Sequence, residues 1–190
     1  MGRSRLTPER EAELYEGVLD LLQEVGYDAL TMDAVATRTR SSKATLYRQW
    51  KGKPELVARA LHRCKPVDAE DVDTGSLRGD FTALFRHIDD GYLAQRAGLL
   101  RGLGMAIHTN PDLHQALRDV LLDPEMSGLK TLLRRAVDRG EIAADCPALQ
   151  FIPHMLIGAF ISRQLLEDRC VDAEFLTAYL DAVVFPALGA

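Results

Sequence analysis

A dense group of cationic and hydroxyl side chains lies within residues 31–56. Between Asp33 and Glu55 the chain has no acidic residue and six basic ones: Arg38, Arg40, Lys43, Arg48, Lys51 and Lys53. Clustered Lys and Arg side chains bind phosphate groups, and a Lys ammonium can also donate to the guanine acceptors of the major groove. The residue types and their spacing therefore indicate a surface that binds double-stranded DNA.

Two short helices joined by a tight turn are predicted to carry these side chains. One begins after Thr31 and the other after Ser42, and both residues are favoured helix N-caps, although Thr31 can also donate its hydroxyl to DNA. In a helix-turn-helix the first turn of the second helix faces the base edges. We therefore expect Lys43 to donate to guanine and Ala44 to contact a thymine methyl group. Lys53 begins the next helix, where its charge and the free amides can bind a phosphate.

The same segment resembles the DNA-binding domain of the TetR family of bacterial transcriptional regulators. The resemblance rests on Thr31, Val35, Ala36, the run Ser42-Lys43-Ala44-Thr45-Leu46-Tyr47, Trp50, and the run Lys53-Pro54-Glu55-Leu56. It covers residues 8–65, and the rest of the chain resembles the family only in its helical layout. The resemblance implies that Tyr47 contacts a base or a phosphate, and that Thr45, Arg48 and Gln49 lie near the DNA backbone.

The turn between the two short helices departs from the family pattern. The family usually has Gly and an apolar residue there, where this chain has Arg40 and Ser41. A left-handed backbone conformation costs Arg more than Gly, because Gly lacks a Cβ atom. We therefore expect this turn to match the family less closely than the two helices do.

Charge is divided unevenly along the chain. The formal net charge of all 190 residues is −5. Residues 1–65 hold 12 Lys and Arg against 9 Asp and Glu, a net charge of +3, whereas residues 66–190 hold 11 against 19, a net charge of −8. A basic part that binds DNA, joined to an acidic body, accounts for this asymmetry. Arg3 and Arg5 can form an arm that adds electrostatic affinity.

Neither a metal site nor a catalytic site is indicated. Cys64, Cys146 and Cys170 are far apart and form no CxxC pair, so we expect reduced thiols in a cytoplasmic protein. The five His residues have no ligand spacing, and no glycine loop resembles a phosphate cradle. The most apolar stretch, residues 151–161, contains Pro153 and is too short to span a bilayer. The expectation is therefore a protein without enzymatic activity, cofactor, metal or membrane contact.

Apolar residues recur with a 3.6-residue period through nearly every segment, which predicts an all-helical protein. We expect a three-helix DNA-binding domain in residues 1–64, with its recognition helix at about residues 43–50. Residues 65–75, rich in Asp with Pro66 and Gly75, read as a linker. Residues 76–190 are expected to form a larger helical domain. Its helices include one from Asn110 to Arg139 that is kinked at Pro124, and one over residues 147–166 that is buried on several sides.

The C-terminal domain is expected to form a homodimer, because one short recognition helix reads too few base pairs to find an operator. The apolar helix at 147–166 and the stripe on residues 173–185 are the best candidates for the interface, since a body of this size need not bury both. Small side chains there permit close packing across a two-fold axis. The candidate interface residues are Gly158, Ala159, Ser162, Leu165, Phe175, Tyr179 and Val183.

The family resemblance also implies a site for a small-molecule inducer in the C-terminal domain. A mixture of apolar and polar side chains among its helices suits such a pocket, although each of these residues can equally be ordinary core. The candidate ligand contacts are Phe85, His87, Tyr92, Met105, His108, Phe151, His154, Met155 and Arg163.

The sequence thus predicts a homodimeric transcriptional repressor that occupies a palindromic operator and leaves it when a small molecule binds. The DNA contacts expected are Thr31, Ser42, Lys43, Ala44, Thr45, Tyr47, Arg48, Gln49 and Lys53. One alternative is an activator or a DNA-binding protein that responds to no ligand. A second alternative is a helical enzyme, which would need clustered acids and bases that the sequence does not show.

Overall fold

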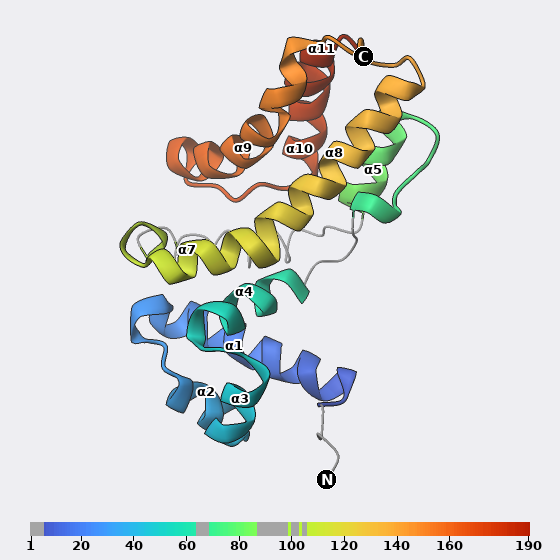
Figure 1. The fold of residues 1–190 in the computed structure, drawn as a ribbon. Coiled ribbons are helices and arrows are strands. Elements are labelled where there is room, and N and C mark those ends of the chain that lie inside the picture. Colours follow the sequence, from blue (N-terminus) through green and yellow to red (C-terminus); the bar gives the residue numbers. More distant parts are fainter. Residues whose placement is uncertain (1–5, 64–68, 87–98, 100–102, 104–105) are drawn as a thin grey trace. The chain divides into compact units, whose positions relative to one another are not determined.

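The computed structural model describes residues 6–63, 69–86, 99, 103 and 106–190, and these residues form helices and connecting turns without any strand (Figure 1). The chain divides into two compact units. Unit 1 consists of Met1–Lys65 and Gly98–Asp123, and unit 2 consists of Pro66–Ala97 and Pro124–Ala190. The expected all-helical fold is confirmed.

In unit 1, the first helix, α1, spans Pro8–Ala29. Thr7 caps it by accepting a hydrogen bond from the Arg10 amide at 3.3 Å, and Pro8 occupies the first helical position, which suits its missing N–H. Gly26 breaks the helix, with a φ of 74°, but one further turn follows and ends at the cap Leu30.

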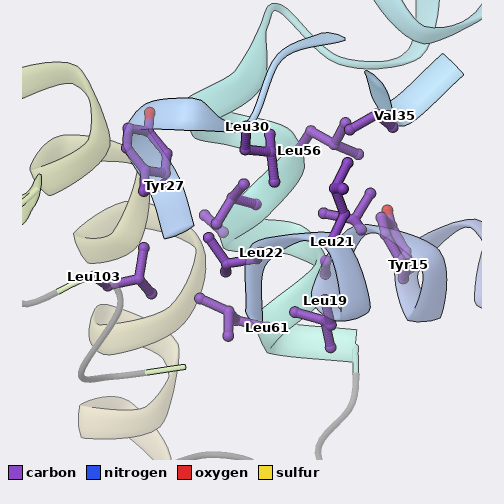
Figure 2. Packing of buried hydrophobic residues seen from close by; sticks show 14 of the residues in the cluster. Tyr15, Leu19, Leu21, Leu22, Tyr27, Leu30, Val35, Leu56, Leu61 and Leu103 are labelled. Atoms are coloured by element: carbon purple, nitrogen blue, oxygen red, sulfur yellow. The ribbon is translucent and has the colours of Figure 1, made fainter. Parts of the chain in front are cut away.

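Three shorter helices follow: α2 spans Met32–Arg38, α3 spans Lys43–Gln49, and α4 spans Lys53–Arg63. Helix α4 packs against both α1 and α7, which spans Pro111–Leu117 and is capped by Asn110. Figure 2 shows apolar side chains from α1, α2 and α4 meeting in one core. The core includes Leu14, Val18, Leu22, Leu46, Leu56, Val57, Leu61, Leu103, Leu113 and Leu117.

Leu99, Leu103 and residues 106–122 pack with the N-terminal helices, although the sequence pattern placed them with the C-terminal body. The reason is that Leu99, Leu103, Ala106 and Leu113 belong to the same buried cluster as the apolar residues of α1 and α4. Periodicity shows that such a helix has a buried face. It does not show which neighbouring helix covers that face.

Unit 2 contains α5 (Leu77–Arg86), α8 (Asp123–Asp138), α9 (Ile152–Glu167), α10 (Ala173–Tyr179) and α11 (Phe185–Leu188). Short 3-10 turns at Ala69–Asp71 and Pro147–Phe151 precede α5 and α9. The core of unit 2 consists of apolar residues from α5, α8, α9 and the C-terminal helices: Leu77, Phe81, Leu129, Leu132, Leu133, Ala136, Ile142, Ile152, Leu180, Val184, Phe185 and Leu188. Within the described ranges, no helix is both long enough and apolar enough to span a membrane.

Two π-helical segments, Arg118–Leu122 and Leu180–Val184, end two residues before a proline. In each, the next residue donates to a carbonyl five residues back: Asp123 to Arg118, and Phe185 to Leu180. Pro124 and Pro186 cannot donate to the carbonyl four residues earlier, and the proline ring clashes with that carbonyl. A widened turn before the proline relieves both problems while the helix continues. The irregularity expected at Pro124 thus takes the form of a π-helical turn.

The turn between α2 and α3 is a Schellman motif whose left-handed position holds Arg40, with a φ of 49°. The Ser41 amide donates to the Ala36 carbonyl at 2.9 Å, and the Arg40 amide donates to the Thr37 carbonyl at 3.3 Å. The same pattern ends α8, but there Gly140 takes the left-handed position. The left-handed conformation that the sequence suggested for this turn is therefore present, and an Arg adopts it.

Replacing Arg40 by Gly should increase the free energy of unfolding by on the order of 1 kcal/mol, because Gly adopts the left-handed conformation without a Cβ clash. Urea unfolding followed by circular dichroism measures the change. The matched control is Arg48→Gly, which also removes one exposed Arg but lies inside α3, where Gly should lower stability by about 1 kcal/mol. Equal destabilisation by both substitutions would show that Arg40 is unstrained.

Candidate nucleic-acid interface

Helix α3 is anchored by two buried side chains, Leu46 and Trp50. The Trp50 indole packs edge-on against the Tyr15 ring of α1, with ring centroids 5.7 Å apart, and its Nε1–H donates to the Tyr15 hydroxyl at 3.2 Å. Tyr15 in turn donates to Glu11 Oε1 at 3.1 Å, and burial raises the Tyr15 pKa to about 12. These contacts fix the rotation of α3 about its own axis, so that the opposite face points to solvent.

The outward face of α3 carries most of the residues predicted to contact DNA. Tyr47 has 56% of its surface exposed, so its ring and hydroxyl are accessible to a partner. Lys43, Ala44 and Arg48 are exposed too, while Gln49 is half-buried. A single helical face thus offers an ammonium, a methyl group, a phenol and a guanidinium to a partner.

The two N-caps hold the start of each short helix in place. Thr31 Oγ1 accepts from the Ala34 amide at 3.1 Å, and Ser42 Oγ accepts from the Thr45 amide at 3.1 Å. The Ser42 and Thr45 hydroxyls also share a hydrogen bond of 2.9 Å. Thr31 and Ser42 are exposed, so their hydroxyl groups stay accessible to a DNA backbone while they cap the helices.

Lys43, the predicted base contact, is paired with an acidic residue of α2. Its Nζ lies 2.6 Å from Asp33 Oδ1, and both side chains are more than half exposed. Exposed ion pairs contribute little to stability, about 0–1 kcal/mol. The pairing therefore leaves Lys43 free to exchange the carboxylate for a guanine acceptor at small cost.

Lys53, the predicted phosphate contact, is held at the start of α4. Its Nζ donates to the Tyr27 carbonyl at 2.9 Å and lies 4.1 Å from the centroid of the Tyr27 ring. Burial lowers the Lys53 pKa, an effect that the nearby Asp28 carboxylate partly opposes. Contacts with a residue of α1 thus hold the Lys53 ammonium in place in the DNA-free protein.

Other cations surround α3. Arg38 lies beside Glu24 of α1 in a two-pronged pair, and the Arg10 guanidinium donates to the Thr39 carbonyl at the end of α2. Arg40 and Lys51 are exposed. Three interactions could not be anticipated from motif spacing: those of Asp33 with Lys43, of Tyr27 with Lys53, and of Tyr15 with Trp50. Each joins residues that belong to different helices or turns.

The candidate ligand contacts are distributed over both units. His87, Tyr92 and Met105 lie outside the described residues, and His108 is exposed in unit 1. In unit 2, Phe85 and Met155 are half-buried, and Phe151 and His154 are exposed with ring centroids 6.3 Å apart. An open groove of about 280 Å³ in this unit has other lining residues: Lys130, Leu133, Arg134, Val137 and Leu149.

Arg163, another candidate ligand contact, already has partners within unit 2. Its guanidinium lies 3.0 Å from Asp172 Oδ2 and 4.1 Å from the centroid of the Phe175 ring, and only 5% of its surface is exposed. Asp172 also caps α10, since it accepts from the Phe175 amide at 2.7 Å. The structure therefore places Arg163 where it ties α9 to the start of α10.

The candidate interface residues differ in exposure. Leu165 has 81% of its surface exposed, and Gly158 and Ser162 are exposed, whereas Ala159 is buried within its own chain. Phe175 and Tyr179 are half-buried with stacked rings, and Val183 is exposed. Residues 147–166 were expected to be buried on several sides. Instead, within unit 2, helix α9 leaves four large apolar side chains in water: Ile157, Ile161, Leu165 and Leu166.

Comparison with known proteins identifies both halves of the chain. Residues 14–60 match the model of bacterial regulatory proteins of the tetR family, and residues 71–183 match that of the tetracyclin repressor-like C-terminal domain. An uncharacterized HTH-type transcriptional regulator of Mycobacterium tuberculosis is 36% identical over 179 residues, 94% of this chain and 88% of that protein. A protein of Mycobacteroides abscessus named DNA-binding transcriptional repressor TetR is 34% identical over 176 residues, 92% of each.

Solved structures agree with this assignment. The crystal structure of the TetR family transcription regulator SCO0332 is 28% identical, with a TM-score of 0.69, over 94% of this chain and 98% of that one. Salmonella enterica GusR, at 17% identity and a TM-score of 0.68, shares the fold over 99% of this chain and all of its own. Regulators of this kind are not enzymes. The matched models and relatives show that this chain belongs to the TetR family of transcriptional regulators and binds DNA through its helix-turn-helix.

Proposed function

We propose that the protein is a repressor that binds a palindromic duplex as a homodimer and releases it when a small molecule binds. The observation that carries the proposal is the outward face of α3, where Lys43, Ala44 and Tyr47 are exposed on a helix anchored from behind. A recognition helix held rigidly by buried contacts suits base recognition, because its side chains must reach the base edges in one register. The relative that is named a repressor supports repression as the mode of regulation in this proposal.

The dimer is supported by the apolar face of α9, which we define as Ile157, Ile161, Leu165 and Leu166. Leu165 and Leu166 are 81% and 80% exposed, and they follow Ile161 along the helix. A contiguous patch of large apolar side chains is uncommon on a monomer and typical of an interface with another protein. A second copy of the same chain offers the same face, so a two-fold contact can cover it.

Release by a small molecule requires that the ligand bind one conformation better than another, since equal affinity for both shifts no equilibrium. The ligand must therefore favour the conformation with lower DNA affinity. We keep the nine candidate ligand contacts as a proposal: Phe85, His87, Tyr92, Met105, His108, Phe151, His154, Met155 and Arg163. Arg163 would take part only by exchanging its pairing with Asp172.

Selection from a random duplex library with the purified protein should return a palindrome. Its half-sites should lie about one helical turn apart or slightly more, because the two α3 helices of a dimer must enter successive major grooves on one side of the duplex. Sequencing of the bound pool measures the result. Recovery of a single unpaired half-site would refute the dimeric mode, and a pool without any motif would refute the operator itself.

Lys43→Ala should weaken the preference for particular base pairs by roughly 1–3 kcal/mol per half-site, if Lys43 donates to guanine. Titrations of the selected duplex and of its single-base variants measure the preference. The control is Lys51→Ala, which removes an exposed cation beyond α3 and should weaken all duplexes evenly. An unchanged base preference in Lys43→Ala would show that another side chain reads the bases.

Gly158→Arg should produce a folded monomer. A Cβ atom added at Gly158 meets nothing within 4 Å in its own chain, so the substitution leaves unit 2 intact. In a dimer, however, it would bury an unpaired charge beside the apolar face of α9, which is strongly unfavourable. Sedimentation velocity measures the oligomeric state, with Thr82→Arg at an exposed position of α5 as a control for added charge. A Gly158→Arg protein that remains dimeric would place the interface elsewhere.

A further inference from the structure

Lys53 and Tyr27 form a contact that the family motif does not predict. The Lys53 ammonium donates one hydrogen bond to the Tyr27 carbonyl at 2.9 Å and lies 4.1 Å from the centroid of the ring of the same residue. A cation over an aromatic face is attracted by the negative charge density of the ring. Two independent contacts with one residue therefore hold the Nζ atom at a defined place.

Tyr27 is itself held in place by the protein core, so it can hold the Lys53 side chain in a defined position. Only 1% of its surface is exposed, and it belongs to the core that also contains Leu30 and Leu103 (Figure 2). Gly26, with a φ of 74°, breaks α1 just before it. Gly adopts this conformation more readily than other residues do, and the break separates the last turn of α1, which contains Tyr27, from the rest of the helix.

The Tyr27 hydroxyl contributes nothing that the structure shows. Among the described residues its oxygen is buried and has no hydrogen-bond partner. Burial raises the Tyr27 pKa to about 12, so the group stays neutral near pH 7. The ring and the carbonyl, and not the hydroxyl, are thus the parts that contact Lys53. This distinction makes Tyr27→Phe a conservative variant.

We propose that Tyr27 is a positioning residue that holds the Lys53 ammonium ready for a DNA phosphate. The proposal rests on the proposed function, since it requires that α4 meet the DNA backbone. An ammonium has three N–H donors. One is used on the Tyr27 carbonyl, and two remain for phosphate oxygens. A Lys side chain loses much rotamer freedom when it binds, and here that freedom is already restricted in the free protein.

The surroundings of Lys53 agree with a bound anion. Lys53 is the first residue of α4, an eleven-residue helix whose N-terminal amides carry partial positive charge. Glu55 in the same turn has its carboxylate occupied by the Lys51 amide at 3.0 Å and by Arg59 Nε at 2.9 Å. The Asp28 carboxylate favours the charged form of Lys53 and so raises its pKa, against the effect of burial. The Lys53 ammonium and the helix terminus therefore present positive charge together.

The test is a double-mutant cycle with Tyr27→Leu, Lys53→Ala and the double variant, together with Tyr27→Phe. Affinity for the duplex selected by the wild-type protein is measured at several salt concentrations. Lys53→Ala should reduce the salt slope by about one unit per half-site. Tyr27→Leu should weaken binding about threefold to tenfold and also reduce the slope, whereas Tyr27→Phe should match the wild type. The double variant should bind no more weakly than Lys53→Ala alone.

A merely structural role for Tyr27 predicts additive losses in the cycle and an unchanged salt slope, and either result would overturn the proposal. Higher affinity in Tyr27→Leu would instead show that Tyr27 withholds Lys53 from DNA, which also overturns it. If Tyr27→Leu does not fold, NMR of the wild type and of Tyr27→Phe decides. The resonances of the Lys53 ε-methylene protons should be shifted upfield by the aromatic ring at position 27 in both proteins. If these resonances show no upfield shift, the contact between Lys53 and the ring is refuted. A wild-type protein that selects no duplex refutes the proposed function, a separate outcome.

Discussion

A seven-residue helix is too short to persist in water on its own backbone hydrogen bonds. Helix α3 therefore depends on the burial of Leu46 and Trp50, and above all on the contact of Trp50 with Tyr15 of α1. That contact determines which side of α3 faces solvent. The exposure of Lys43 and Tyr47, and hence the ability to bind DNA, follows from it.

Features that depend on neighbouring residues could be predicted from the sequence. Thr31, Ser42 and Asn110 lie where a hydroxyl or amide side chain precedes an apolar period, and each caps the helix expected to begin there. The buried positions of α1, α3 and α4 follow from the same period. The turn at Arg40 was expected to match the family less closely, because a left-handed conformation costs Arg more than Gly, and the structure shows that Arg40 adopts that conformation.

Features that depend on residues far apart in the chain could not be predicted. Lys43 and Lys53 were expected to contact DNA, but the sequence did not show their partners within the protein, Asp33 and Tyr27, which lie on other helices. Likewise, the apolar residues Leu99, Leu103, Ala106 and Leu113 give no sign in the sequence of which core they join, because Leu and Ala fit any apolar neighbour equally well. For the same reason, the sequence predicts that residues 147–166 are buried on several sides but does not show which of these sides their own domain covers.

The uneven charge of the chain bears on how the protein searches a genome. Residues 1–65 carry a net charge of +3, but the remainder carries −8, so the molecule as a whole is repelled by DNA. At physiological ionic strength charges act over only about 8 Å, so the basic segment is attracted only once it is nearly in contact. Approach with the acidic segment foremost is unfavourable. Electrostatic attraction to DNA of arbitrary sequence therefore draws on the basic segment alone and is opposed by the charge of the rest of the chain.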